Sequence, residues 1–120
     1  MLNNITLMGR LVKEPEIRQT NSGTSVTSFT LAVDRDFGEE TDFIDCVAWR
    51  QTAEFVSKYF SKGQLVAVKG RLQSRKWEDR DGNKRTSWEV VAESVYFAEK
   101  KEQTKEPKLA DDYGDGDIPF

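Results

Sequence analysis

The sequence predicts an all-β fold, a small closed barrel with one short helix, and three observations support this prediction. Most of residues 1–97 alternates between apolar and polar side chains with the period of two that is typical of strands. Turn signals rich in Gly, Asn and Asp separate the alternating stretches. A single stretch has the spacing of an amphipathic helix. Many strands with one short helix favour a barrel or a sandwich.

The elements follow one another as three strands, one helix and two strands. The predicted strands are residues 3–12, 24–37, 42–50, 64–77 and 84–97. The predicted turns within this order are residues 21–23, 38–40 and 81–82. Residues 53–60 are predicted to be helical because four apolar side chains fall on one side, and Gly63 supplies a C-terminal stop. This order is that of a five-stranded OB-fold barrel with one short helix between strands 3 and 4, although other small barrels share it.

The composition excludes several classes of function. The 120 residues suffice for one domain, and His is absent, which excludes Ser-His-Asp and Cys-His nucleophiles and imidazole metal ligands. Cys46 is the single cysteine, so no internal disulfide or thiolate metal cluster forms, and its apolar neighbours predict a core residue. We therefore expect no enzyme, no metal and no cofactor.

The N-terminal residues lack the features of a signal peptide, and no apolar run is long enough to span a membrane. The chain is expected to be soluble, without a membrane partner. Its expected place is the cytoplasm, associated with the nucleoid, or the host cytoplasm if a phage encodes it.

The charge divides the chain into two parts. The whole chain has 18 basic and 21 acidic residues, a net charge of 18 − 21 = −3. Residues 1–97 hold 14 of each sign, whereas residues 98–120 hold 4 basic and 7 acidic residues, or 4 − 7 = −3. We predict a folded domain over residues 1–97, a disordered tail with a flexible linker over 98–110, and an acidic tip over 111–120.

Two strands have one face that suits a barrel interior and another that does not. In the third strand the predicted interior set is Ile44, Cys46 and Ala48, and the opposite set is Phe43, Asp45, Val47 and Trp49. In the fourth strand the interior set is Val66, Val68 and Leu72, and the opposite set is Lys69, Arg71, Gln73, Arg75 and Trp77. Aromatic rings are therefore expected on a partly wet surface beside basic residues.

Such a surface is typical of single-stranded nucleic-acid binding, because bases stack on rings and cations neutralise phosphates. Residues 69–85 carry seven basic and three acidic residues, a local charge of 7 − 3 = +4. The alternative is that these aromatics are cross-strand packing partners on a solvated hairpin. Trp88 is interpreted as structural, paired across the hairpin with Trp77. The acidic stretch between residues 34 and 42 is interpreted as a solvated loop rather than a cation site.

Several motifs occur in a specific order along the whole chain. They are NNITLMGRL at residues 3–11, PEIR at 15–18, FTLAV at 29–33, AEFVSKY at 53–59, KG at 62–63, RKW at 75–77 and DIPF at 117–120. With these motifs the chain resembles the bacterial single-stranded DNA-binding proteins. The resemblance implies an OB-fold that assembles as a homotetramer and wraps single-stranded DNA.

The resemblance also implies particular contact residues. Its stacking platforms fall on Phe37, Phe43, Trp49 and Trp77, and its basic positions on Lys62, Arg75 and Lys76. Lys69 and Arg71 join the predicted DNA-binding set because they share a strand face with Trp77. Many relatives have Trp where this chain has two of its Phe platforms, so stacking should be weaker there. Asp45 and Gln51 stand where relatives often have Arg and Lys.

The C-terminal tip resembles the partner-binding tip of the same family. Its predicted contact residues are Asp115, Asp117, Ile118, Pro119 and Phe120. The terminal ring would fill an apolar pocket while aspartates steer approach to basic replication, recombination and repair proteins. The 13-residue linker spans about 20 Å, so partners would dock close to the domain.

Three functions are compatible with the sequence. The leading one is a non-catalytic protein that binds single-stranded DNA without sequence preference and recruits partners. The alternatives are an accessory replication factor whose OB-fold mainly docks proteins, and a nuclease, which rests only on the acidic stretch. A simple solubilising role for the tail does not explain its Ile-Pro-Phe ending.

Overall fold

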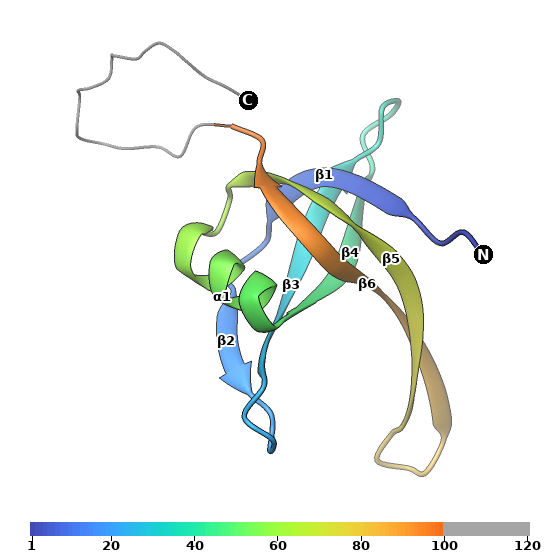
Figure 1. The fold of residues 1–120 in the computed structure, drawn as a ribbon. Helices are drawn as coiled ribbons and strands as arrows, with labels where there is room; N and C mark the ends of the chain where they lie inside the picture. Colours follow the sequence, from blue (N-terminus) through green and yellow to red (C-terminus); the bar gives the residue numbers. More distant parts are fainter. Residues whose placement is uncertain (100–120) are drawn as a thin grey trace.

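The computed structural model describes residues 1–99 (Figure 1). Its elements are β1 (Ile5–Leu11), β2 (Glu16–Gln19), β3 (Ser25–Asp34), β4 (Thr41–Trp49), α1 (Arg50–Tyr59), β5 (Leu65–Glu78) and β6 (Lys84–Phe97). The linker and the tip predicted from the sequence fall, from residue 100 onward, outside the described residues.

The strands form one sheet that closes on itself. The strand order is β1-β5-β6-β4-β3-β2, and a further pairing of β1 with β3 closes the ring. All pairings are antiparallel except β4 with β6, which run parallel because β5, which lies between them along the chain, runs in the opposite direction. The sheet and its single helix confirm the predicted OB-fold barrel.

The first strand differs from the prediction, because the structure divides it in two. Leu11 pairs with Leu31 and Glu16 with Ser28, so both β1 and β2 lie along β3. Between these pairs the first strand uses two more residues than β3 does. Pro15 lies in this interval and has no N–H to donate to a ladder. β2 is therefore the continuation of β1 after a break, which is why the structure has six strands where five were predicted.

The core is formed by apolar side chains from β1, β3, β4, β5 and β6 and from α1. The buried core comprises Leu11, Phe29, Leu31, Cys46, Ala48, Ala53, Val56, Phe60, Val66, Val68, Val90, Ala92 and Val95. Cys46 lies in this core as predicted, together with Ala48 and the partly buried Ile44. The helix begins at Arg50 rather than residue 53 and ends with Phe60 as its C-cap, before Gly63.

Beyond the barrel, β5 and β6 continue as a two-stranded hairpin, which we call the arm, residues 71–78 and 84–91 (Figure 1). The two strands pair down to Glu78 and Lys84, and Gly82 at the tip has φ +82°, as a tight hairpin turn requires. Leu72 was predicted to lie in the barrel interior, but it is exposed. It has the expected parity, yet it lies at the edge of the barrel, where its partner Val90 is still buried but Leu72 itself is left uncovered.

Candidate nucleic-acid interface

The outer face of β4 presents aromatic side chains to solvent. Phe43 is 67% exposed, and Trp49 at the end of the strand is also exposed, as the alternation predicts. Val47, between them, is covered in a small outer cluster with Val26 and Val91. Because Val47 of β4 lies beside Val91 of β6, this outer face continues from β4 onto β6 and the arm.

The arm has two faces because alternate residues point to opposite sides of a strand. The front face continues the outer face of β4 and carries Arg71, Gln73, Arg75 and Trp77 of β5 with Arg85, Ser87, Glu89 and Val91 of β6. The back face carries Leu72, Ser74, Lys76 and Glu78 with Lys84, Thr86, Trp88 and Val90. The front face therefore joins four of the predicted residues to those of β4: Lys69, Arg71, Arg75 and Trp77.

The register of the arm bears on two sequence predictions. Lys76, which is predicted to contact DNA, lies on the back face, away from Arg75 and Trp77. Trp88 was expected to pair with Trp77, but the register puts Arg85 opposite Trp77 and Ser74 opposite Trp88. The indole N–H of Trp77 instead donates to Ser87 Oγ at 2.8 Å, which orients the ring on the front face.

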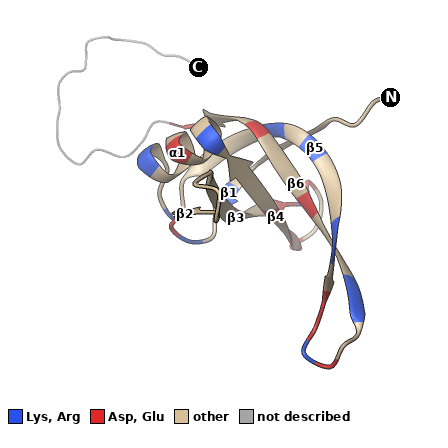
Figure 2. Cartoon of the chain, turned by 60° about the horizontal axis from the view of Figure 1, so that its bottom comes forward, with Lys and Arg blue, Asp and Glu red and all other residues tan. Residues whose placement is uncertain are grey.

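The cations of the front face are held by carboxylates of β6 and the hairpin turn. Lys69 Nζ and Arg71 Nε each lie 3.8 Å from Glu93, the extra residue of β6 at the β-bulge. Arg75 Nε lies 3.6 Å from Glu89, and Arg85 Nε lies 2.9 Å from Asp79. Figure 2 shows basic residues along β5 and acidic residues along β6. The pairs of Lys69 and Arg71 with Glu93 are exposed on both sides and therefore weak, whereas the side chains of Glu89 and Asp79 are largely covered.

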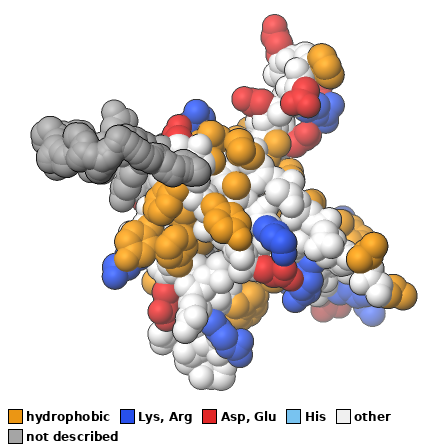
Figure 3. Space-filling model, turned by 45° about the horizontal axis from the view of Figure 1, so that its top comes forward, with side chains coloured by type: hydrophobic (Ala, Val, Ile, Leu, Met, Phe, Trp, Pro, Cys, Tyr) orange, Lys and Arg blue, Asp and Glu red, His pale blue; other side chains and the backbone are white. Residues whose placement is uncertain are grey.

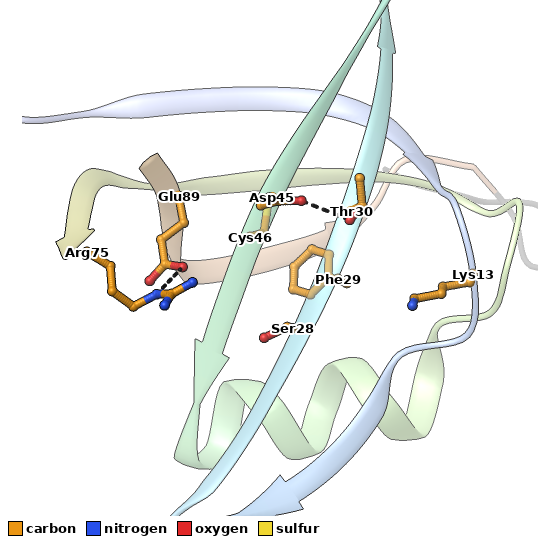
Figure 4. A pocket seen from close by; sticks show the side chains of 8 residues that line it. All are labelled: Lys13, Ser28, Phe29, Thr30, Asp45, Cys46, Arg75 and Glu89. Atoms are coloured by element: carbon orange, nitrogen blue, oxygen red, sulfur yellow. Dashed lines mark hydrogen bonds and ion pairs between the residues drawn. The ribbon is translucent and has the colours of Figure 1, made fainter. Parts of the chain in front are cut away.

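A cleft of about 280 Å³ connects the barrel to the arm (Figure 4). Its lining comprises Lys13, Ser28, Phe29, Thr30, Asp45, Cys46, Arg75 and Glu89. Asp45 accepts a hydrogen bond from the Thr30 hydroxyl at 3.1 Å, and Glu89 pairs with Arg75 on the arm side of the cleft. The cleft thus mixes two cations with two carboxylates, and each acidic group reduces its attraction for an anion.

The buried thiol of Cys46, at the floor of the cleft, has low reactivity. Burial, together with the nearby Asp45 and Glu89 carboxylates, raises the pKa of Cys46 to about 12. The thiol therefore stays protonated at neutral pH and is a poor nucleophile.

The loop between β3 and β4 holds Phe37, which is 90% exposed. Arg35 braces this loop through ion pairs to Glu40 and Asp42, each at 3.0 Å, and the Arg35 guanidinium lowers the pKa of Asp42. Figure 3 shows the acidic side chains of this loop at upper right. Within residues 1–99 no group of three or more acidic, Cys or His side chains is placed to hold a metal ion. The loop reads as a solvated one that exposes a ring.

Lys62, like Phe37 and Lys76, lies apart from the predicted residues gathered on the outer face. It lies in the turn between α1 and β5, where its backbone N–H donates to Glu14 at 3.2 Å, and it does not line the cleft. Three further residues were not predicted as part of the site. Lys13 and Glu89 line the cleft, and Trp88 is exposed on the back face. Alternation alone could have placed Glu89, since it shares the parity of Val91.

A comparison with known families decides the relationship. A family model described as "Single-strand binding protein family" matches residues 2–98. The chain belongs to the single-strand binding protein family. A Streptococcus pyogenes relative named "Single-stranded DNA-binding protein 1" is 45% identical and is covered, like this chain, over its full length.

Two more relatives are similar over most of this chain. "Single-stranded DNA-binding protein 2" of Listeria monocytogenes is 47% identical across 94% of this chain and 74% of its own. "Single-stranded DNA-binding protein A" of Bacillus subtilis is 51% identical across 84% of this chain and 62% of its own. No helix among the described residues is long and apolar enough to cross a membrane.

Proposed function

We propose that the chain binds single-stranded DNA without sequence preference, on the outer face of β4 and the front face of the arm. The observation that supports this most is that exposed rings from two elements, Phe43, Trp49 and Trp77, share one outer surface with Lys69, Arg71 and Arg75. Each stacked base contributes about 1–3 kcal/mol, and every base offers a π-face. Membership of the single-strand binding protein family supports the same conclusion.

The binding mechanism uses displacement of weak ion pairs. Free of DNA, each front-face cation is kept in place by a carboxylate, which lowers the cost of ordering its long side chain. A phosphate replaces that carboxylate, and counterions leave the DNA as it binds. Stacking then holds the bases, with Phe37 and Phe43 as smaller rings than the tryptophans. We place Lys62 as an outlying phosphate contact along the strand's path.

Intrinsic tryptophan fluorescence tests this proposal directly. Titration with oligo-dT should quench the emission strongly, and added salt should weaken binding because counterion release drives it. A blunt duplex of equal length is the matched control, since its bases are not free to stack. Equal quenching by the duplex would contradict the proposal.

We further propose that the tip recruits replication, recombination and repair proteins. Asp115, Asp117, Ile118, Pro119 and Phe120 combine negative charge with a terminal apolar ring, which suits a basic pocket with an apolar floor. Removing residues 111–120 should leave oligo-dT binding intact or stronger and abolish capture of such partners. Loss of DNA binding on truncation would contradict this division.

We propose a homotetramer as the assembly. β1 pairs with β5 over residues 5–10 but with β3 only at Arg10 and Leu11, so its other edge is open over most of its length. Met8 is exposed on the same strand. An open edge beside an exposed apolar side chain favours strand pairing with a second copy. Mass measured in solution tests this, and a monomer at micromolar concentration would contradict it.

These roles place the protein in the cytoplasm with the nucleoid, or in the host cytoplasm if a phage encodes it, and make it a binding protein rather than an enzyme.

A second function, docking of proteins by the barrel itself, has one observation in its favour. Phe55, Tyr59 and Phe97 form an exposed aromatic group around the end of α1. It predicts weak DNA quenching together with tight partner binding after the tip is removed.

A further inference from the structure

The back face of the arm carries the most exposed tryptophan of the chain. Trp88 is 61% exposed, compared with 42% for Trp77 on the front face. Within residues 1–99 its ring is in no aromatic pair and its indole N–H makes no hydrogen bond, whereas Trp77 is tied to Ser87. Leu72 is exposed two positions away across the ladder. Packing within the described chain therefore gives Trp88 no role.

The two faces of the arm also differ in how their cations are paired. On the front face, Arg71, Arg75 and Arg85 are each in an ion pair. On the back face, Lys76 and Lys84 make no ion pair with any residue from 1 to 99, although Glu78 lies opposite Lys84 in the ladder. The back face thus offers two available ammonium groups against one carboxylate.

The positions of these groups match the chemistry of a single strand. Along the back face of β6, Thr86 lies one step from Trp88 and Lys84 lies two steps from it. Lys76 of β5 lies opposite Thr86. Both lysines are therefore within two steps of the ring. One step along a face is about 7 Å, so Lys76 lies about 7 Å and Lys84 about 14 Å along the face from Trp88. A ring flanked by unpaired cations suits a base with its neighbouring phosphates.

We propose that the back face of the arm is a second single-strand-binding surface, on which Trp88 stacks a base and Lys76 and Lys84 hold neighbouring phosphates. The inference rests on the proposed DNA-binding function and extends it to a strand that passes around the arm. A second copy of the chain is a poorer occupant, because a symmetric back-to-back contact would bring four lysines against two carboxylates. Lys76, displaced from the front face, thereby acquires a role beside Trp88.

Single-tryptophan variants test the proposal. The chain has three tryptophans, so W49F/W77F leaves Trp88 as the sole reporter while keeping a ring at each front position. Saturating oligo-dT should quench its emission, and salt should reverse the effect. The matched control, W49F/W88F, reports on Trp77 alone.

The outcomes separate the two claims. Quenching of Trp77 without any change at Trp88 would overturn the back-face site and keep the proposed function. No quenching of either would overturn the function itself, and the inference with it. A Trp88 emission that follows protein concentration and ignores DNA would mean that a second copy covers this face, which also overturns the inference.

Affinity measurements provide the second test. Trp88→Leu keeps an apolar side chain but removes the ring, and should weaken binding of a long oligo-dT about fivefold or more. Trp88→Phe should retain most of the affinity, and Lys76→Gln should lower the salt dependence. Tyr59→Leu, an exposed ring on α1 outside both DNA surfaces, is the control. Equal affinities of Trp88→Leu and the wild type would overturn the proposal.

Discussion

The same two strands, β5 and β6, build two regions with opposite properties. Within the barrel, Val66 and Val68 are completely buried and Gly70 packs against the backbone of β6. Within the arm, most side chains are exposed on both faces, and Val90 and Val91 at its base are the buried exceptions. A strand with a core on one side has one face left for binding, whereas a strand pair without a core has two. Substitutions in the barrel should therefore change stability, and those in the arm should change binding.

The largest expected effect is on the stability of the barrel. A Cβ at Gly70 would overlap the carbonyl oxygen of Val91, a backbone atom that cannot move aside. Gly70→Ala should lower the free energy of unfolding by about 3 kcal/mol or more. Gly82→Ala in the arm has open space and only its φ of +82° to oppose it, and should cost about 1 kcal/mol. Denaturant unfolding compares the two, and equal costs would contradict the comparison.

The second-largest expected effect is a loss of affinity for DNA when two exposed tryptophans are removed. Trp49→Ala with Trp77→Ala removes two exposed rings from the proposed DNA surface. Affinity for oligo-dT should fall by about 2–6 kcal/mol, while unfolding changes far less. Anisotropy of a labelled oligonucleotide measures this without tryptophan emission. Undiminished binding would show that the strand runs elsewhere.

A pH effect distinguishes the interior of the barrel from the arm. The folded pKa of Cys46 is about 12, above its ordinary value of 9.0, so folding favours the neutral thiol. As the pH rises from 9 toward 12, the unfolded state loses this proton first, and stability falls, by about 1 kcal/mol at pH 10. Cys46→Ala should lose less stability between pH 8 and pH 10 than the wild type. Parallel pH profiles for the two proteins would contradict the burial assigned to this thiol.

The smallest effect sharpens the account of the front face. Glu89→Gln removes the carboxylate that holds Arg75, and should tighten oligo-dT binding about two- to fivefold. Arg75→Gln should weaken binding and reduce the slope of log affinity against log salt by about 0.7. Asp45→Asn, which neutralises the other carboxylate of the cleft, is a second test and should also tighten binding. A salt slope unchanged by Arg75→Gln would mean that this guanidinium meets no phosphate.

The sequence predicted the order of strands and helix along the chain, apart from the division of β1 from β2, and the faces of β4, because alternation and turn signals are local properties. It did not predict that Leu72 is exposed, since alternation gives the side to which a residue points but not where the barrel ends. The residue opposite Trp88 depends on the register of the hairpin. The conformation of the turn sets that register, and alternation does not reveal it. The division of β1 from β2 depends on pairing with β3, which residues 3–19 alone do not encode.

The central claim is that DNA lies on the outer face of β4 and the arm, away from the aromatic group at the end of α1. Photochemical cross-linking of the full chain to 5-iodouracil-substituted oligo-dT, with mass spectrometric mapping, tests it most directly. We expect cross-links at Phe43, Trp49 and Trp77 that compete with unlabelled oligo-dT. Cross-links confined to Phe55, Tyr59 and Phe97 would contradict the account.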